Sequence, residues 1–307
     1  MKSEMGYRFK GSGFEAPEEK KEYQEPNDKL KQAFQWWLHT HAGDRNELYQ
    51  RACEFLDGIE ATAEEANALL ISCQKPRGDE ALFVSAVYSK AKEKEIIFDV
   101  DLDTPPQELG FRLPKDKVLI AKANTGHYLG FQSEGMVINY ANTGEQLGYF
   151  AKGSVINYGK AGSRIEEVTK ETTGLFINMG TINGNLGYGL VGAVLNLGTA
   201  QTMMGDYKGV TLVDLEGLHV NPIDLPELHI KCKHYAKVPK VRKYLDELIS
   251  KLEAGRADHQ AAIKTIEDLG PEPAQKITAD LKKALGWRYW VPKWLRSISG
   301  VFDFYDP

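Results

Sequence analysis

The stretch GMVINYANTGEQLGYFAK (residues 135–152) is followed by three further versions of itself: GSVINYGKAGSRIEEVTKETT (153–173), GLFINMGTINGNLGYGLV (174–191) and GAVLNLGTAQTMMGDYK (192–208). An earlier unit, KVLIAKANTGHYLGFQSE, begins at Lys117, and a shorter one, GVTLVDLEG, begins at Gly209. These starting points give a period of about 18 residues, with one longer unit from Gly153. A fixed period of this length indicates one small supersecondary unit per repeat, with each unit stacked on its neighbours.

Two residue types recur at fixed places in the unit. The leading glycines are Gly135, Gly153, Gly174, Gly192 and Gly209, and the asparagines four positions later are Asn139, Asn157, Asn178 and Asn196. Glycine suits tight corners and places where successive coils pass closely. The run V-I-N-Y has the β-branched and aromatic character of a strand. The pattern therefore predicts a parallel β-helix in which the four asparagines stack as a hydrogen-bonded ladder.

Alternation within the strand divides its residues between two faces. We predict that one set lies inside the rod with the asparagines: Leu119, Val137, Val155, Phe176, Val194 and Thr211. The other set, which ends in the charged Lys122 and Asp214, we place outside: Ile120, Ile138, Ile156, Ile177, Leu195 and Leu212. Because the outer set is also apolar, something must cover it: the chain's own helices, a second copy or another protein. We expect at least one flanking helical segment to pack lengthwise on this face.

The stretch LGYFAKGSVINYGKAG resembles the GXGXG-type repeat, G-x-x-x-x-G-x-[IV]-x-x-x-G-x-A-G, of the C-terminal domain in the glutamate synthase large subunit, which also forms the C subunit of formylmethanofuran dehydrogenase. Its matching glycines are Gly148, Gly153, Gly159 and Gly162. The resemblance covers about residues 117–217 and neither flank. It implies a right-handed, single-stranded parallel β-helix, here of about six coils, each of about 18–21 residues. In that family the domain is chiefly a scaffold between catalytic parts, so the resemblance transfers no catalytic residue.

Composition narrows the class of protein further. The 307 residues carry a net charge of −5, which gives no electrostatic case for nucleic acid binding. Three cysteines (Cys53, Cys73 and Cys232) are too few for a disulfide framework and favour a reducing compartment. The N-terminus has no apolar signal-peptide core, and no long apolar run indicates a transmembrane segment. We therefore expect a cytoplasmic protein.

The remaining chain is mainly α-helical around the predicted rod. We expect a disordered tail over 1–26, a helical block over 27–94, a strand and linker over 95–116, the β-helix over 117–217, a connector over 218–238, and a helical block with an aromatic tail over 239–307. Thr62 and Glu65 form a capping-box pattern before the third helix, and Gly255 ends a long amphipathic helix. An uncapped β-helix exposes a bare strand edge, so we expect the first helical block to cap one end of the rod.

Two groups have residue types that support chemistry. His229, Cys232 and His234, with His219 upstream, are of zinc-binding type, but they lack a paired spacing. The carboxylates Glu166, Glu167 and Asp206 lie on the rod, where a β-helix carbohydrate enzyme would hold an acid and a base. Adjacent residues on a strand point apart, so we interpret both groups as solvated or packed side chains. The sequence thus predicts no catalytic residue, no metal and no cofactor.

The C-terminal segment holds the most unusual residues outside the repeat: Trp287, Tyr289, Trp290 and Trp294. Packing against the rod, where it would close an edge, is our first interpretation. A docking surface is the second, because aromatic residues and arginine dominate interface energetics. Contact with a membrane surface is the third and is not favoured, since the stretch is short and interrupted by proline.

Three hypotheses of function follow. The preferred one is a structural scaffold without catalytic activity, acting through contact with a protein partner or another copy of itself. The second is an accessory subunit of a larger redox enzyme, as the resemblance to the C subunit of formylmethanofuran dehydrogenase implies. The third is a carbohydrate-active β-helix enzyme, so the question of enzymatic activity stays open at this point. Partner identity, oligomeric state and metal binding at His229 are not decided by the sequence.

Overall fold

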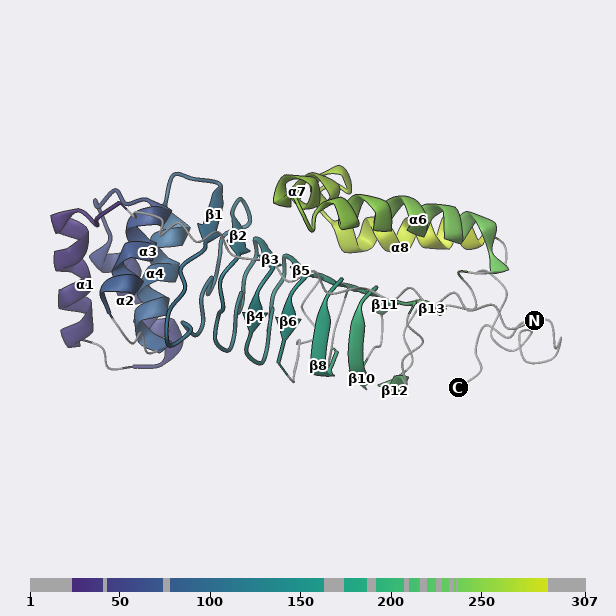
Figure 1. Cartoon of the computed structure of the whole chain (residues 1–307), viewed down its shortest axis with the longest axis horizontal. Coiled ribbons are helices and arrows are strands. Elements are labelled where there is room, and N and C mark those ends of the chain that lie inside the picture. Colours follow the sequence, from purple (N-terminus) through teal and green to yellow (C-terminus); the bar gives the residue numbers. More distant parts are fainter. Residues whose placement is uncertain are drawn as a thin grey trace.

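A computed structural model shows an elongated molecule made of helices and a coiled stack of strands (Figure 1). Among the described residues, four helices lie at one end of the stack, and three more lie along one of its sides. The structure describes residues 24–40, 43–73, 78–162, 174–186, 192–206, 210–215, 220–224, 228–231, 235 and 237–286. Of the tail expected over residues 1–26, only 24–26 are described; residues 1–23 and the aromatic segment from 287 onward lie outside these ranges.

The N-terminal block consists of α1 (Asp28–Thr40), α2 (Arg45–Phe55), α3 (Ala63–Ser72) and α4 (Gly78–Lys90). The predicted capping box is confirmed, because the Thr62 side chain accepts from the Glu65 amide and the Glu65 carboxylate accepts from the Thr62 amide. Asp44 caps α2 in a similar way. The helices pack around Phe34, Trp37 and Phe83, whose rings contact one another.

Eight parallel strands form the larger sheet, in the order β1 (Glu95–Phe98), β2 (Val118–Ala121), β3 (Met136–Asn139), β5 (Ser154–Asn157), β7 (Leu175–Asn178), β9 (Gly192–Asn196), β11 (Val210–Asp214) and β13 (Leu228–Lys231). The smaller sheet runs β12 (Val220–Asp224), β10 (Thr199–Asp206), β8 (Thr181–Asn185), β6 (Lys160–Ala161) and β4 (Asn142–Thr143). Successive strands of each sheet come from successive coils, so the predicted parallel β-solenoid with flanking helices is confirmed. Strands β1, β12 and β13 lie outside the predicted limits 117–217 and lengthen the stack.

The predicted number of coils is wrong: the structure has about four turns rather than six. One reason is that a repeat unit does not always complete both sheets. The unit from Lys117 gives β2 to the larger sheet but only an isolated bridge, from Thr125 to Thr143, on the other side. Counting repeats in the sequence therefore overestimates the number of full turns.

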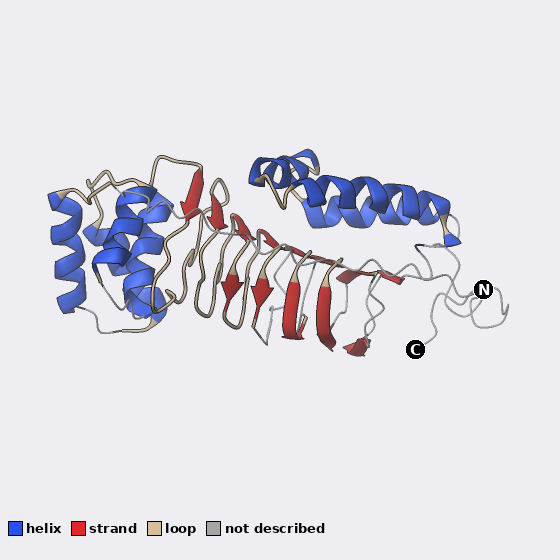
Figure 2. Ribbon diagram, in the orientation of Figure 1, coloured by secondary structure: helices blue, strands red, loops and turns tan. Residues whose placement is uncertain are grey.

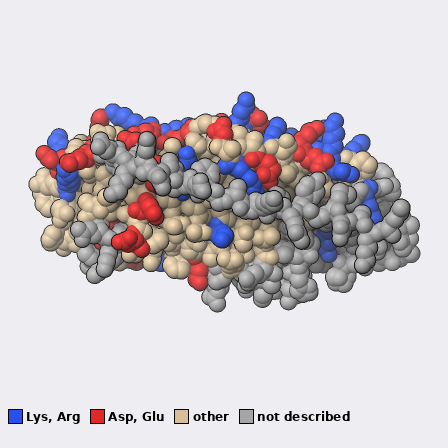
Figure 3. All heavy atoms as spheres, viewed as in Figure 1, with Lys and Arg blue, Asp and Glu red and all other residues tan. Residues whose placement is uncertain are grey.

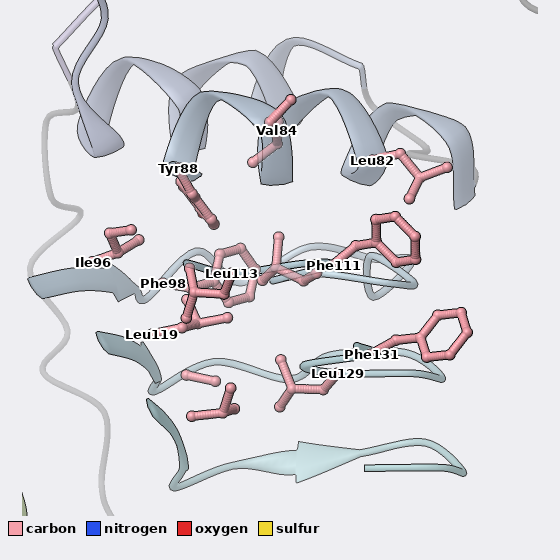
Figure 4. Close-up of a cluster of buried hydrophobic side chains, with 14 of the residues drawn as sticks. Leu82, Val84, Tyr88, Ile96, Phe98, Phe111, Leu113, Leu119, Leu129 and Phe131 are labelled. Atoms are coloured by element: carbon pink, nitrogen blue, oxygen red, sulfur yellow. The ribbon is translucent and has the colours of Figure 1, made fainter. Parts of the chain in front are cut away.

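The N-terminal block caps the first coil, as predicted. Tyr88 of α4 lies over Ile96 and Phe98, Leu82 lies over Phe111, and one hydrophobic cluster continues from these helices into the rod interior (Figure 4). At the same edge the Asn67 side chain donates to the carbonyl oxygen of Ile97 at 2.8 Å. The block thus covers a strand edge whose backbone groups would otherwise be open to another strand.

Three C-terminal helices cover the larger sheet: α6 (Pro239–Ala254), α7 (His259–Asp268) and α8 (Pro273–Leu285) (Figures 1 and 2). The outward residues Ile120, Ile138, Ile156, Ile177 and Leu195 form a second core with the helix residues Val241, Leu245, Leu248, Leu252, Ile277 and Leu281. This confirms that a flank packs lengthwise on the apolar outer face. Of the three possible covers named above, the chain's own helices are the one found.

The strand faces predicted for the last unit are wrong by one residue. Val210 pairs with Gly192 and Leu212 with Val194, so this unit keeps the register of the others and does not start at Gly209, which lies outside the described residues. Leu212 consequently joins the interior cluster. Thr211 instead faces α8, where the Thr278 hydroxyl donates to it at 2.8 Å. Asp214, predicted on the outside, is buried in the asparagine column.

Candidate interaction surface

The predicted asparagine ladder is present inside the rod. Each side-chain amide donates to the next side-chain oxygen, at 2.9 Å from Asn139 to Asn157, 3.0 Å from Asn157 to Asn178 and 2.9 Å from Asn178 to Asn196. The ladder has one more member, because Asn196 donates to the Asp214 carboxylate at 3.1 Å. All five side chains are buried. Each asparagine amide donates within the rod, and among the described residues only the Asn139 oxygen at the end of the ladder lacks a donor, so the ladder is a structural element.

The leading glycines lie where coils approach each other closely. A Cβ on Gly153 would lie 1.9 Å from the carbonyl oxygen of Gly135, and one on Gly174 would lie 2.9 Å from that of Gly153. A second glycine column follows the asparagines, and there a Cβ on Gly180 would lie 2.1 Å from the carbonyl oxygen of Gly159. These distances leave no room for a side chain, which explains the recurrence of glycine.

Two stacked tyrosines fasten α6 to the rod. The Tyr140 and Tyr158 rings lie 5.0 Å apart at 14°, and their hydroxyls donate to the carbonyl oxygens of Gly255 and Leu252 at the end of α6. Burial raises the pKa of both phenols above the usual value, so both hydroxyls stay protonated as donors. Gly255, the C-cap residue of α6, has a φ of −64° that any residue can adopt, so its glycine has a steric reason: a Cβ there would lie 2.3 Å from the Tyr158 hydroxyl and 2.7 Å from the Cβ of Ala262.

Sequence reasoning missed an aromatic cluster at one corner of the first coils, which we call the aromatic corner: Phe111, Tyr128, Phe131, Tyr149 and Phe150. Its rings contact in series, with centroids 5.3 Å apart for Phe111–Phe131, 5.6 Å for Tyr128–Phe131 and 4.3 Å for Tyr149–Phe150. Phe111 and Phe131 are buried, whereas the other three rings are half-buried. Figure 4 shows Phe111 and Phe131 one above the other at the end of their coils.

The backbone of this corner is left-handed at several bulky residues. Tyr128 has a φ of 64° and Phe150 a φ of 55°, and the nearby Gly130 and Gly148 have 73° and 69°. Arg112, Gln132 and Phe150 occupy equivalent places in successive coils, because the amide of Arg112 donates to Phe131 and that of Gln132 to Tyr149. A left-handed conformation is unusual for a residue with a Cβ and costs about 1–2 kcal/mol. Of the glycines noted in the repeat, Gly148 lies at this corner, but no feature of the pattern indicated the aromatic residues around it.

Two arginines flank the aromatic corner. The Arg45 guanidinium lies 4.4 Å from the centre of the Tyr128 ring and forms an ion pair of 2.5 Å with Glu108. Arg112 lies 5.6 Å from the Phe111 ring, and its Nε donates to the Gln132 side chain at 3.0 Å. Guanidinium groups stacked on rings in this way are held in defined orientations. Buried beneath them, Tyr49 contacts Phe111, and burial raises the pKa of its phenol to about 12.

The smaller sheet presents a row of polar side chains to the outside. Asn142, Lys160 and Thr199 are exposed and lie in register with the half-buried Thr181, whose hydroxyl accepts from Thr199 at 3.1 Å. In the part of the chain that the structure describes, all helices lie away from this sheet (Figure 2). Figure 3 shows acidic and basic side chains gathered along the helices and sparse over the middle of the rod.

The other candidate residues are mostly outside the described ranges. His229 lies in β13, but Cys232, His234 and His219 are not described, nor are Glu166, Glu167 and the side chain of Asp206. Among the described residues, no group of three or more histidine, cysteine or acidic side chains is arranged to hold a metal ion. Burial raises the pKa of the Cys73 thiol to about 11 and also raises that of Cys53, which disfavours the thiolate form of both.

The segment holding Trp287, Tyr289, Trp290 and Trp294 lies beyond the last described residue, so its role stays a prediction. Within the described ranges, no helix combines the length and the apolar character needed to span a bilayer. The chain matches no family model, no curated protein and no solved structure. The fold and its surfaces are therefore the basis for a functional proposal.

Proposed function

We propose that this chain is a structural scaffold without catalytic activity, which acts through protein–protein contact in the cytoplasm. The observation that supports this most directly is that one sheet is covered by helices and the other is exposed. Helices of the same chain cover the larger sheet, while Asn142, Lys160 and Thr199 lie exposed on the smaller one. A rod with in-register coils gives a partner a rigid surface of fixed spacing.

Internal rigidity supports the same proposal. The ladder from Asn139 to Asp214 joins successive strands of the larger sheet, from β3 to β11, through side-chain hydrogen bonds. The interior cluster continues into the N-terminal helices, so the cap and the rod share one core. Extended binding surfaces are the usual product of such stacked repeats. We include in this proposal a right-handed coil and a likeness to the glutamate synthase and formylmethanofuran dehydrogenase domains. If the protein partner is a redox enzyme, the chain acts as its accessory subunit.

Purification of the tagged full-length chain from its native source tests the proposal. We expect a stoichiometric complex, larger than the 34.3 kDa monomer by size-exclusion chromatography with light scattering. Asn142→Arg with Thr199→Arg should weaken the complex, because two bulky charges would stand on the flat smaller sheet. Ser250→Arg, a matched change at an exposed position on α6, should leave it intact.

Two results would contradict the scaffold function. One is a chain that elutes alone as a monomer from the native lysate at low and moderate salt. The other is hydrolysis of a polysaccharide by the purified chain, which would support the carbohydrate-active hypothesis and direct attention to Glu166, Glu167 and Asp206.

A further inference from the structure

We propose that the aromatic corner, together with Arg45 and Arg112, docks an extended acidic segment of a partner protein. This proposal rests on the scaffold function and names one contact through which it works. Two independent features of the corner support the docking proposal. Bulky side chains occupy left-handed backbone positions, and arginine side chains lie on aromatic rings.

The turn holds non-glycine residues in the left-handed region in each of three coils: Glu108 and Arg112, Tyr128 and Gln132, and Gln146 and Phe150 have φ values between 51° and 64°. Tyr128 and Phe150 have φ values of 64° and 55°, positions at which glycine or asparagine is the unstrained choice. Gly130 and Gly148, two residues from them, show that the chain does use glycine in this turn. Residues with a strained backbone cluster at active sites and ligand-binding sites. Both rings are half-buried, so part of each faces solvent.

The arginines determine the charge of the ligand. Glu108 offsets the charge of Arg45 through their ion pair of 2.5 Å. The contacts described above for Arg112 are with neutral groups, the Gln132 amide and the Phe111 ring, and its side chain is exposed. Its planar fork is therefore oriented and available to a carboxylate, which it binds in a bidentate manner. Arginine and tyrosine are also the residue types that contribute most binding energy at protein interfaces.

The dimensions of the corner favour a peptide segment over a folded domain. Arg112, Gln132 and Phe150 lie on three successive coils, which are about 4.8 Å apart. An extended segment of about three or four residues spans that distance. The surface that such a segment buries is far smaller than the roughly 800 Å² per partner that stable domain interfaces bury. We therefore expect weak, salt-dependent binding of a short carboxylate-bearing segment.

The test uses the full-length protein and two labelled peptides, one of alternating glutamate and proline and one with glutamine in place of every glutamate. Fluorescence anisotropy should show binding of the glutamate peptide at low salt and at least about tenfold weaker binding of the glutamine peptide. Arg112→Gln should weaken binding of the glutamate peptide about tenfold, and Arg112→Lys about threefold, because lysine keeps the charge but not the fork. Tyr128→Asn, which suits the left-handed backbone, should weaken binding while the protein remains folded by circular dichroism.

Arg242→Gln is the matched control, because Arg242 on α6 is exposed and also stacks on a tyrosine, 5.9 Å from the Tyr235 ring. It should leave the affinity unchanged. Equal binding of the two peptides, binding of neither, or an equal loss with Arg242→Gln would each overturn the proposal. If the glutamate peptide fails to bind while the complex from native lysate persists, the acidic-segment proposal is refuted and the scaffold function stands.

Discussion

The central rung of the asparagine ladder offers the sharpest test of how the rod is held together. Asn157→Leu keeps the side-chain size similar and removes three hydrogen bonds: the one accepted from Asn139 at 2.9 Å, the one donated to Asn178 at 3.0 Å and a longer one donated to the carbonyl oxygen of Gly159 at 3.4 Å. The Asn139 amide still donates to the carbonyl oxygen of Ala141 at 2.9 Å. The Asn178 oxygen loses its ladder donor in the interior. A buried acceptor left in this state costs about 1–3 kcal/mol, which is the expected loss in the free energy of unfolding.

Urea unfolding followed by circular dichroism measures this loss, with the midpoint and slope extrapolated to water. Asn142→Leu is the control, because this asparagine lies on the exposed face of β4 and its replacement should change the free energy of unfolding by less than about 0.5 kcal/mol. Equal effects of the two substitutions, or a more stable Asn157→Leu protein, would refute the view that the ladder stabilises the rod.

Three further predictions concern the end of the ladder at Asn139, the contact between Gly255 and Tyr158 at the end of α6, and the capping box of α3. Among the described residues no donor reaches the buried side-chain oxygen of Asn139, and its partner on the preceding strand is Ala121. Ala121→Asn should therefore add one hydrogen bond to the ladder and raise the free energy of unfolding by about 1 kcal/mol in the same urea assay. Gly255→Ala should destabilise the protein thermally, and by less in a Tyr158→Phe background, because removing the hydroxyl relieves the 2.3 Å approach. Burial raises the pKa of Glu65, but hydrogen bonds to its carboxylate outweigh this and hold the pKa below the usual 4.5. Because the folded-state pKa is depressed, the Glu65 carboxylate stabilises the protein above pH 4.5, and this stabilisation is lost as the pH falls through the lower folded value. Glu65→Gln should therefore lack this step in a plot of the free energy of unfolding against pH.

The repeat made most of the rod predictable. A regular period with asparagine at one phase specified which residues become neighbours, because each ladder bond and each strand pairing needs that spacing. The prediction failed where the repeat marker was a glycine without an asparagine. Taking Gly209 as the marker shortened the last spacing by one position, whereas the carboxylate of Asp214 replaces the missing amide as acceptor and restores the regular spacing from Asn196.

The aromatic corner was not predictable by the same reasoning. Left-handed backbone at Tyr128 and Phe150 contradicts the intrinsic preference of both residue types, so a rule that assigns such positions to glycine passes over them. Arg45 belongs to α2, far from the Tyr128 ring in the sequence, and reaches the corner only because the cap packs on the first coil. A surface assembled from separate elements leaves no local pattern in the chain.

Ile156 tests whether the helices truly replace a partner on the larger sheet. Its side chain is 0 % exposed, in the core shared with α6. Ile156→Glu would place a carboxylate in that core, where an unpaired charge costs several kcal/mol or drives the helices off the sheet. Detached helices would leave an apolar stripe that associates with other copies, so light scattering should show oligomers and urea unfolding a separate early transition. Lys160→Glu, at an exposed site on β6, should leave the protein monomeric and equally stable. A stable, monomeric Ile156→Glu protein would mean that the helices do not cover this face in solution, and the larger sheet would then be the partner surface.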